Sequence, residues 1–372
     1  MKRFIPILLL VAGGCSTPYP LPSVPGGHGV LVVDGVIYAG NDSTAIRLTR
    51  SKDFSDSTTI PVETGAHVVL EPASGGTSYT LKDNGSGYYV SAGLNLDNSQ
   101  TYRLDITLSG GAHYQSDYVP VVPSPAIDSI NFVQSPTDRL TIFANTHDPA
   151  GKTRYYMWRY VETYEYHSFY ASLYKAVGDT LLPRDTSVEV CYRSIASTDI
   201  LIASSAGLTA DQIHEAPIEI FYNNDMRLWI EYSTLVTQIA LTEGAYNYWQ
   251  NMKANSENLG SIFGPQPFQA QGNIHSVSNP NEVVIGYVSI STPAQQRIFI
   301  QNGQLTSWPV SLPNCPEETA DLTKHGVAWY FGPPSINVPI DYASPTLVLM
   351  AAGDCADCRY DGGTVIKPSY WP

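Results

Sequence analysis

The sequence DNGSGYY, at residues 83–89, places a glycine-rich turn directly before two tyrosines. The glycine spacing in Gly85-Ser86-Gly87 does not fit the nucleophile elbow of a hydrolase, so we interpret this segment as a hairpin turn. GAHVVL (65–70) precedes it and YRLDI (102–106) follows it, and both are rich in β-branched or aromatic residues. Such segments between turn residues predict short β-strands.

The same pattern extends outward in both directions from this turn. Each segment is β-branched or aromatic, and Gly, Asn, Asp, Ser or Pro fills the gaps. Many short strands within about 100 residues predict a β-sandwich. The sandwich resembles immunoglobulin-like, prealbumin-like and carboxypeptidase-regulatory-like modules, which bind and space rather than catalyse. The predicted strands are 30–38, 44–50, 65–71, 78–82, 87–92, 101–108 and 113–121.

Three prolines, Pro120, Pro123 and Pro125, mark the predicted domain boundary. Proline stiffens a connection and cannot donate to a sheet ladder. We therefore expect a β-sandwich domain at residues 28–122 and a larger β-rich domain at residues 127–372. Segments 154–170 and 282–291 are the clearest strands of the second domain. Asn279-Pro280-Asn281 is predicted to form the turn between strands 271–277 and 283–291.

One prominent helix is predicted in the second domain. Thr242 is a suitable N-cap, and Gly260 is suited to end the helix in a left-handed turn. Apolar residues recur every three or four positions, which gives one apolar face. They are Leu241, Ala245, Trp249 and Met252.

The N-terminus is typical of a bacterial lipoprotein signal peptide, residues 1–14. Lys2 and Arg3 precede an apolar run, which two glycines and Cys15 follow. The run is far shorter than the ~20 residues that a membrane-spanning helix needs. Cys15 is therefore predicted to be lipidated, and residues 15–27, rich in proline, to form an extended tether. The alternative is a cleaved signal of a soluble secreted protein.

The charge of the chain excludes two classes of partner. It has 20 basic and 34 acidic residues and a formal net charge of −14 at pH 7. Loss of Lys2 and Arg3 with a signal peptide makes it more negative still. Such a chain repels nucleic acid and anionic lipid surfaces. The membrane is expected to hold this protein through its lipid anchor alone.

Four further cysteines are expected to pair in an oxidising compartment. They are Cys191, Cys315, Cys355 and Cys358. Four cysteines allow three connectivities, and the sequence does not choose among them. A zinc site that uses all four, or a redox pair at Cys355 and Cys358, is the alternative. A redox Cys-x-x-Cys normally opens a helix in a βαβ setting, which is not evident here, so we predict two disulfides.

An aromatic stripe is the most unusual feature of the second domain. Its members alternate along one strand and so share one face. They are Tyr156, Trp158, Tyr160, Glu162, Tyr164, Tyr166 and, beyond Ser168, Tyr170. Stacked rings beside a carboxylate suit a platform for a sugar or a peptide. The same rings equally suit an ordinary sandwich core, with their hydroxyl groups at its rim.

The sequence nominates no catalytic residue, metal ligand or cofactor. The eight histidines lack the i, i+4 spacing of a helical metal site, and no phosphate loop or dinucleotide fingerprint is present. The acidic runs at 53–56 and 354–361 lack the calcium-loop pattern. We therefore expect a protein that is not an enzyme.

Ordered motifs along the chain resemble the Bacteroidota lipoprotein family known as domain of unknown function 4249. Each motif is weak, but their order and coverage are specific. They are LVVDGVI (31–37), IDSI (127–130), YYMWRY (155–160), YSTLVTQ (232–238), GNIH (272–275), CADCR (355–359), GGT (362–364) and KPSYW (367–371).

The resemblance implies an outer-membrane lipoprotein, because members are often encoded beside TonB-dependent transporters of the SusC type. We expect a non-enzymatic binding or accessory protein for such a nutrient transporter, with a small ligand, peptide or glycan of unknown identity as cargo. The alternatives are a structural or adhesive envelope scaffold and a hydrolase with an unrecognised site. Residues 16–21 lack the acidic residues typical of surface-exported lipoproteins, so a periplasm-facing anchor is compatible with the sequence as well.

Overall fold

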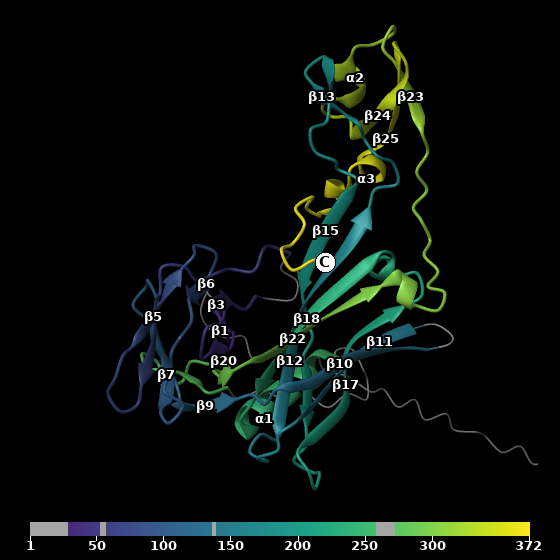
Figure 1. The fold of residues 1–372 in the computed structure, drawn as a ribbon. Coiled ribbons are helices and arrows are strands. Elements are labelled where there is room, and N and C mark those ends of the chain that lie inside the picture. Colours follow the sequence, from purple (N-terminus) through teal and green to yellow (C-terminus); the bar gives the residue numbers. More distant parts are fainter. Residues whose placement is uncertain (1–28, 53–56, 136–138, 258–271) are drawn as a thin grey trace, which may run out of the picture.

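The computed structural model describes residues 29–52, 57–135, 139–257 and 272–372. Cys15, the expected tether at 15–27, the acidic run at 53–56 and the expected helix end at Gly260 lie outside these ranges. The described chain is mostly β and forms three bodies (Figure 1). We call them the N-terminal sandwich (29–123 and 272–292), the central sandwich (127–167, 190–240 and 294–304) and the distal lobe (169–189 and 313–361).

The N-terminal sandwich is a 12-stranded sheet that curls on itself, as predicted for a sandwich of short strands. Its order is β2-β21-β9-β7-β4-β5-β6-β3-β1-β20, while β8 pairs with β7 and β19 pairs with β8. The first nine strands are β1 (Leu31–Asp34), β2 (Ile37–Tyr38), β3 (Thr44–Arg50), β4 (His67–Pro72), β5 (Tyr79–Asp83), β6 (Tyr88–Ser91), β7 (Thr101–Thr107), β8 (His113–Ser116) and β9 (Val119–Pro123).

The glycine-rich turn at residues 83–89 links β5 to β6, as predicted. The Asp83 carboxylate accepts hydrogen bonds from the N–H groups of Gly85 (2.7 Å) and Gly65 (2.5 Å). Gly85 and Gly87 have φ angles of 83° and 76°, which glycine adopts without strain. The buried Tyr89 hydroxyl accepts a hydrogen bond from the N–H of Ala66 (2.9 Å), so the turn also fixes the start of β4.

The last three strands of this sandwich come from the second half of the chain. They are β19 (Ile274–Ser276), β20 (Val284–Gly286) and β21 (Ile290–Thr292). β20 pairs with β1, β19 with β8, and β21 lies between β2 and β9. Ile274, Val284 and Ile290 join the same apolar core as Leu31 and Leu104. The turn expected at Asn279-Pro280-Asn281 is present, because the N–H of Glu282 donates to the carbonyl of Asn279 (2.9 Å).

The expected division at 127–372 therefore does not hold as one continuous body. The prolines mark the place where the chain first leaves the N-terminal sandwich, at β9. They do not show that the chain returns there through residues 272–292, because that return depends on pairing between strands far apart in sequence.

The central sandwich packs two antiparallel sheets over one core. One sheet has the order β10-β11-β17; the other has the order β15-β12-β18-β22, with β16 also on β12. Its elements are β10 (Ile127–Gln134), β11 (Arg139–His147), β12 (Tyr155–His167), β15 (Val190–Ala196), β16 (Leu201–Ser204), β17 (Gln212–Tyr222), η1 (Met226–Leu228), β18 (Glu231–Ala240), β22 (Ala294–Gln301) and η2 (Asn302–Gln304).

Helix α1 (Glu243–Glu257) lies between the two sandwiches. The Thr242 hydroxyl accepts a hydrogen bond from the N–H of Ala245 (3.2 Å), which confirms the predicted N-cap. Ala245 packs with Val36 of the N-terminal sandwich and with Met157 of β12. The helix therefore joins the two bodies through a shared apolar cluster.

The distal lobe lies at the far end of β12 and β15 (Figure 1). It holds β13 (Tyr174–Val177), β14 (Thr180–Pro183), β23 (Glu318–Asp321), α2 (Val327–Phe331), β24 (Asn337–Ser344), β25 (Leu347–Ala352), α3 (Gly353–Ala356) and η3 (Cys358–Asp361). Two disulfides are present, as predicted: Cys191–Cys358 and Cys315–Cys355. Cys355 and Cys358 thus have different partners, unlike the alternatives of one zinc site or a redox pair.

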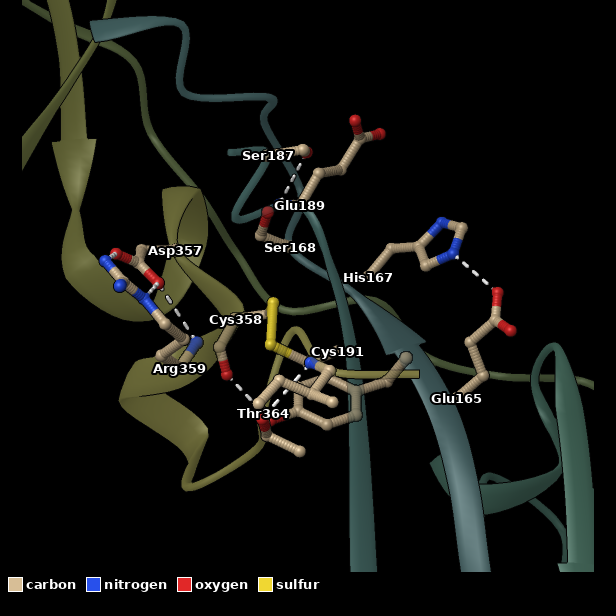
Figure 2. The surroundings of a disulfide bond; sticks show 12 residues. Glu165, His167, Ser168, Ser187, Glu189, Cys191, Asp357, Cys358, Arg359 and Thr364 are labelled. Carbon is tan, nitrogen blue, oxygen red and sulfur yellow. Dashed lines mark hydrogen bonds and ion pairs between the residues drawn. A yellow bond between two sulfur atoms is a disulfide. The ribbon is translucent and has the colours of Figure 1, made fainter. Parts of the chain in front are cut away.

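The C-terminal segment, residues 362–372, straps the outer face of the central sheet. Tyr192 and Thr364 exchange two backbone hydrogen bonds, 2.8 and 2.9 Å long. Thr364 lies beside the disulfide of Cys191 and Cys358 (Figure 2). Trp371 is only 6% exposed and packs edge-on against Tyr192 and Phe299. Its indole N–H donates to the Glu165 carboxylate (3.2 Å). The strap thereby covers the upper part of β12.

Candidate functional site

The predicted aromatic stripe on β12 lies in the core of the central sandwich. Tyr156, Trp158 and Tyr160 are all buried in its main apolar cluster. The indole N–H of Trp158 donates to the amide oxygen of Gln238 (3.0 Å), and the Tyr156 hydroxyl donates to Asp211 (3.0 Å). These groups are already satisfied by protein partners, which favours the interpretation of the stripe as core packing.

Glu162 belongs to a buried ionic cluster and not to an open binding surface. Its side chain is 5% exposed, and its Oε2 lies 2.8 Å from Nη1 of Arg227. Arg227 also pairs with Glu219 at 3.0 Å and with Asp225 at 2.7 Å, and the Tyr160 hydroxyl donates to Glu219. Burial raises the pKa of Glu162, and the charge of Arg227 opposes that rise. The cluster fixes η1 against the two sheets.

The upper members of the stripe hold the disulfide region. The Tyr166 hydroxyl donates to the carbonyl of Cys358 (2.7 Å), and the Tyr170 hydroxyl donates to the carbonyl of Cys315 (2.9 Å). Tyr164 is half-buried and packs against Tyr166, with ring centroids 5.8 Å apart. The structure therefore links these members of the stripe to both disulfides through hydrogen bonds.

A cavity lies against the opposite face of β12. It has a volume of about 550 Å³ and lies between the N-terminal and central sandwiches, with α1 beside it. We call it the interdomain cleft. Its volume lies within the ~300–1,000 Å³ of typical small-molecule sites, which often form between domains.

Neighbouring strands of the N-terminal sandwich form one wall of the cleft. Asp34 of β1 is directly opposite Arg47 of β3, and Arg47 is directly opposite Tyr88 of β6. Directly opposed residues point to the same side of a sheet, so the three side chains form a row. A second, apolar part of the wall comes from Val32 of β1 and Ile285 of β20, which are also paired.

The facing wall comes from the central sandwich and α1. Met157 and Arg159 line the cleft from β12, next to the loop at 196–200. Ser197 anchors this loop, because its hydroxyl accepts a hydrogen bond from the N–H of Tyr160 (2.9 Å). The helix contributes Tyr248 and Trp249.

The cleft has four charged groups: Asp34 and Arg159 pair with each other, whereas Arg47 and Asp199 have no ion-pair partner among the described residues. Oδ1 of Asp34 lies 3.6 Å from Nη2 of Arg159, which joins the two walls. No carboxylate within the described ranges lies at ion-pair distance from Arg47. Its guanidinium carbon lies 5.2 Å from the ring centroid of Tyr88.

Two buried donors on the lining also lack acceptors. They are Nε of Arg47 and Nε1 of Trp249. Burial chiefly, and also the charge of Asp34, raises the pKa of Tyr248 to about 12, although a hydrogen bond with the Gly286 backbone lowers it. The phenol is therefore neutral at physiological pH. The cleft thus offers aromatic faces, unmet donors and a free cation, all of which suit ligand binding.

Groups suited to covalent or metal chemistry are not gathered here. Among the residues that the structure describes, the lining includes no histidine or cysteine. In the described ranges, three or more His, Cys, Asp or Glu side chains nowhere come together as a metal site would require. The arrangement can bind and orient a ligand.

A second hollow, of about 500 Å³, lies beside the loops at 147–154 and 209–212. It has two carboxylates: Asp211 has a buried Oδ2 without a partner among the described residues, and Asp148 accepts hydrogen bonds from the N–H groups of Ala150, Lys152 and Thr153, at 2.8–2.9 Å. The Asp148 carboxylate is therefore occupied in shaping its own turn. The hollow also lacks the aromatic walls of the interdomain cleft, which is therefore the stronger candidate.

The sequence pattern pointed to the other face of the strand that lines this cleft. The aromatic residues at even positions drew attention, whereas Met157 and Arg159 at odd positions line the cavity. The signals that were present are the motifs LVVDGVI and YYMWRY, which contain Asp34 and Arg159. Nothing in the sequence indicated that these two motifs face each other.

Comparisons with known proteins concern family and fold. No curated protein matches the chain. A two-domain fibronectin type-III segment of chicken tenascin is 11% identical and covers 57% of this chain and 90% of its own, with a TM-score of 0.15. The FN1–FN3 domains of chicken CNTN1 are 10% identical and cover 55% of this chain and 59% of their own, with a TM-score of 0.19.

Both likenesses have TM-scores below 0.5, and nothing about this chain is concluded from them. Across the described ranges, no helix combines the length and apolar character needed to span a membrane.

A family model, Domain of unknown function (DUF4249), matches residues 17–297, which include every strand of both sandwiches up to β21 and the start of β22. The chain belongs to the DUF4249 family.

Proposed function

We propose that this protein is a non-enzymatic, lipid-anchored binding protein of the outer membrane. It serves as an accessory component of a TonB-dependent nutrient transporter of the SusC type, and the interdomain cleft holds the cargo. The observation that carries the binding role is the cleft itself, with its aromatic walls, its free Arg47 and its unmet buried donors. A lipid on Cys15 supplies retention at the membrane, and the proline-rich tether supplies reach.

The way in which the two sandwiches are joined supports a preformed site. The chain crosses between them after β9 and again after β21, which are adjacent parallel strands. Near the crossings, Gln238 of β18 donates to the carbonyl of Pro125 (2.9 Å), and the N–H of Ala240 donates to the Ser124 hydroxyl (2.8 Å). With α1 packed against both bodies, the walls of the cleft are held in place. A preformed site loses less ordering entropy when it binds.

One observation favours the second candidate function, a structural or adhesive scaffold. The distal lobe exposes large apolar side chains, with Trp329 68% and Ile336 63% exposed. Exposed apolar groups of this size are suited to contact with another protein. A scaffold would use this lobe and would leave the cleft without cargo.

Native co-purification tests the proposal. An affinity tag placed after the exposed Pro372, on a flexible linker, allows the protein to be isolated from gently solubilised outer membranes and its companions to be identified by mass spectrometry. The expected result is a stoichiometric TonB-dependent transporter. The Cys15→Ala variant is the matched control, and it should lose both the membrane fraction and the transporter. A protein that is recovered alone, or only with scaffold proteins, contradicts the transporter role.

A further inference from the structure

The interdomain cleft also indicates the chemistry of its cargo. Resting on the binding role proposed above, we infer that the cleft takes a carboxylate joined to an apolar or aromatic body, and that the guanidinium of Arg47 binds that carboxylate. The argument depends on which charges of the cleft are already paired, which donors are unmet, and what covers the rest of the lining.

Arg47 stands apart from most other arginines of the described chain. In a protein with 34 acidic and 20 basic residues, a cation readily finds an acid. Salt bridges hold Arg50, Arg103, Arg159, Arg184, Arg227 and Arg359. Arg47 instead lies over Tyr88, on the wall of a cavity. Asp34, its direct neighbour across the sheet, pairs with Arg159 on the facing wall.

The buried donors point to an acceptor supplied by the ligand. A buried donor with no acceptor destabilises the folded protein. Two such groups, Nε of Arg47 and Nε1 of Trp249, belong to residues that line opposite walls of one cavity. A ligand with two acceptor oxygens next to an apolar body can serve the cation and remain in contact with the rings.

A carboxylate fits this arrangement better than a phosphate or a neutral sugar. The charges of the lining cancel, because Asp34 and Asp199 oppose Arg47 and Arg159. A phosphate with two negative charges would be repelled by both Asp34 and Asp199, whereas a monoanionic carboxylate needs only one free cation. A guanidinium binds a carboxylate through two parallel hydrogen bonds, and a neutral sugar would leave it unpaired. The rest of the lining, including Val32, Met157 and Tyr88, suits an apolar or aromatic side chain.

Matched ligands test the inference on the full mature protein in detergent. The probes are N-acetyl-leucyl-phenylalanine as the free acid, the same dipeptide as its C-terminal amide, and 3-phenylpropionate as a small free acid. Isothermal titration calorimetry gives each affinity. We expect the free acid to bind at least ~10-fold more tightly than the amide, since charge-assisted hydrogen bonds are the stronger ones. Preference between the dipeptide acid and 3-phenylpropionate distinguishes a peptide terminus from a free carboxylic acid.

Variants identify the residue responsible. Arg47→Gln should weaken binding of the free acid by ~10-fold or more and leave the amide nearly unchanged. Arg139→Gln is the matched control, because Arg139 is an exposed arginine on β11, away from the cleft. Trp249→Phe keeps an aromatic ring but removes the N–H donor, and it should weaken both dipeptides to a smaller extent. Thermal unfolding of each variant establishes that it is folded.

Three results would overturn the inference: equal affinity for acid and amide, no binding of any probe, or an Arg47→Gln variant that is folded and binds as the wild type does. These outcomes are separate from failure of the proposed function. If the transporter co-purifies and the probes do not bind, only the ligand class is wrong. If the free acid binds through Arg47 and no transporter co-purifies, the binding site is retained and the accessory role fails.

Discussion

Asp34 and Arg159 form an ion pair across the interdomain cleft, with Oδ1 and Nη2 3.6 Å apart. Asp34 is also directly opposite Arg47 in the sheet register, yet among the described residues it forms its ion pair with Arg159 and not with Arg47. Its pairing with Arg159 joins the two walls and leaves Arg47 as the free cation. The position of one acid thus determines which arginine is available to a ligand.

Replacing this acid should therefore strengthen binding of carboxylates. Asp34→Asn removes one negative charge from the lining, so the affinity for the free-acid dipeptide should rise severalfold and the gain should shrink as salt is added. The pair is partly exposed, at 35% and 57%, so the free energy of unfolding should change by less than about 1 kcal/mol. Calorimetry and urea unfolding measure the two quantities.

Glu317→Gln is the control for this charge change, because Glu317 is exposed and lies outside the cleft. It should leave carboxylate affinity unchanged. Equal affinities of Asp34→Asn and wild type would contradict the electrostatic account of the cleft.

The two disulfides should contribute unequally to stability. Cys191–Cys358 closes a loop across 167 residues and Cys315–Cys355 one across 40, and the longer loop restricts the unfolded chain more. Changing both Cys191 and Cys358 to serine should lower the free energy of unfolding by about 2–5 kcal/mol, and changing the other pair should cost less. Urea unfolding of the two double variants gives the comparison.

Peptide mapping without reductant checks the pairing itself. It should recover peptides linked from Cys191 to Cys358 and from Cys315 to Cys355. A link between Cys355 and Cys358, or four free thiols, would contradict the structure.

The C-terminal strap should stabilise the central sheet through one side chain. Trp371→Ala removes the ring of a residue that is 6% exposed, and it should lower the free energy of unfolding by about 3 kcal/mol. Trp371→Phe keeps most of the apolar contact and loses the hydrogen bond to Glu165, so it should cost about 1 kcal/mol. Deleting Pro372 alone is the matched control and should change little. Equal stability of all three variants would show that the strap does not hold the sheet.

The Arg227 cluster should make stability depend on pH. In the folded protein the pKa of Glu162 is raised, by burial above all. The contribution of Glu162 to the free energy of unfolding is therefore fully present at pH values below its pKa in the unfolded chain. It is lost as the pH rises through its pKa in the folded protein. Arg227→Met leaves three carboxylates without their cation, raises the pKa of Glu162 further, and should cost about 3–5 kcal/mol. The loss in the free energy of unfolding caused by Arg227→Met should be larger at pH 8 than at pH 5.

Glu162→Gln separates charge from packing in this cluster. The amide cannot ionise, so this variant should cost less than Arg227→Met and should lose the part of the pH dependence that belongs to Glu162. Chemical unfolding at the two pH values measures both effects. A deficit of Arg227→Met that is independent of pH would count against the ionic account.

The strands of the N-terminal sandwich could be predicted because their signals are local. Alternation of buried residues and the Asp83–Gly87 turn fix β5 and β6, and Thr44–Arg50 was predicted with the bounds that β3 has. By contrast, residues 282–291 were predicted as one strand but form two, β20 and β21, and the place of β20 beside β1 was not predicted. Parallel pairing with a segment some 250 residues away has no local signature.

The site was harder to predict than the fold for a similar reason. Tyr156 and its even-numbered neighbours are conspicuous because cores use large aromatic residues. Arg47, Arg159 and Trp249 come from three separate parts of the chain, and each is unremarkable alone. The cysteines were predicted to pair, but Cys191 and Cys358 meet only because the distal lobe brings η3 back to β15.

Hydrogen–deuterium exchange tests the central claim, that the interdomain cleft is the ligand site, most directly. The mature protein is compared with and without the free-acid dipeptide, and Arg47→Gln serves as the control. We predict slower exchange at residues 31–34, 45–49 and 245–252, no change in the distal lobe, and no protection in Arg47→Gln. Protection confined to the distal lobe or to the hollow at 147–154, with the cleft unchanged, would contradict the account.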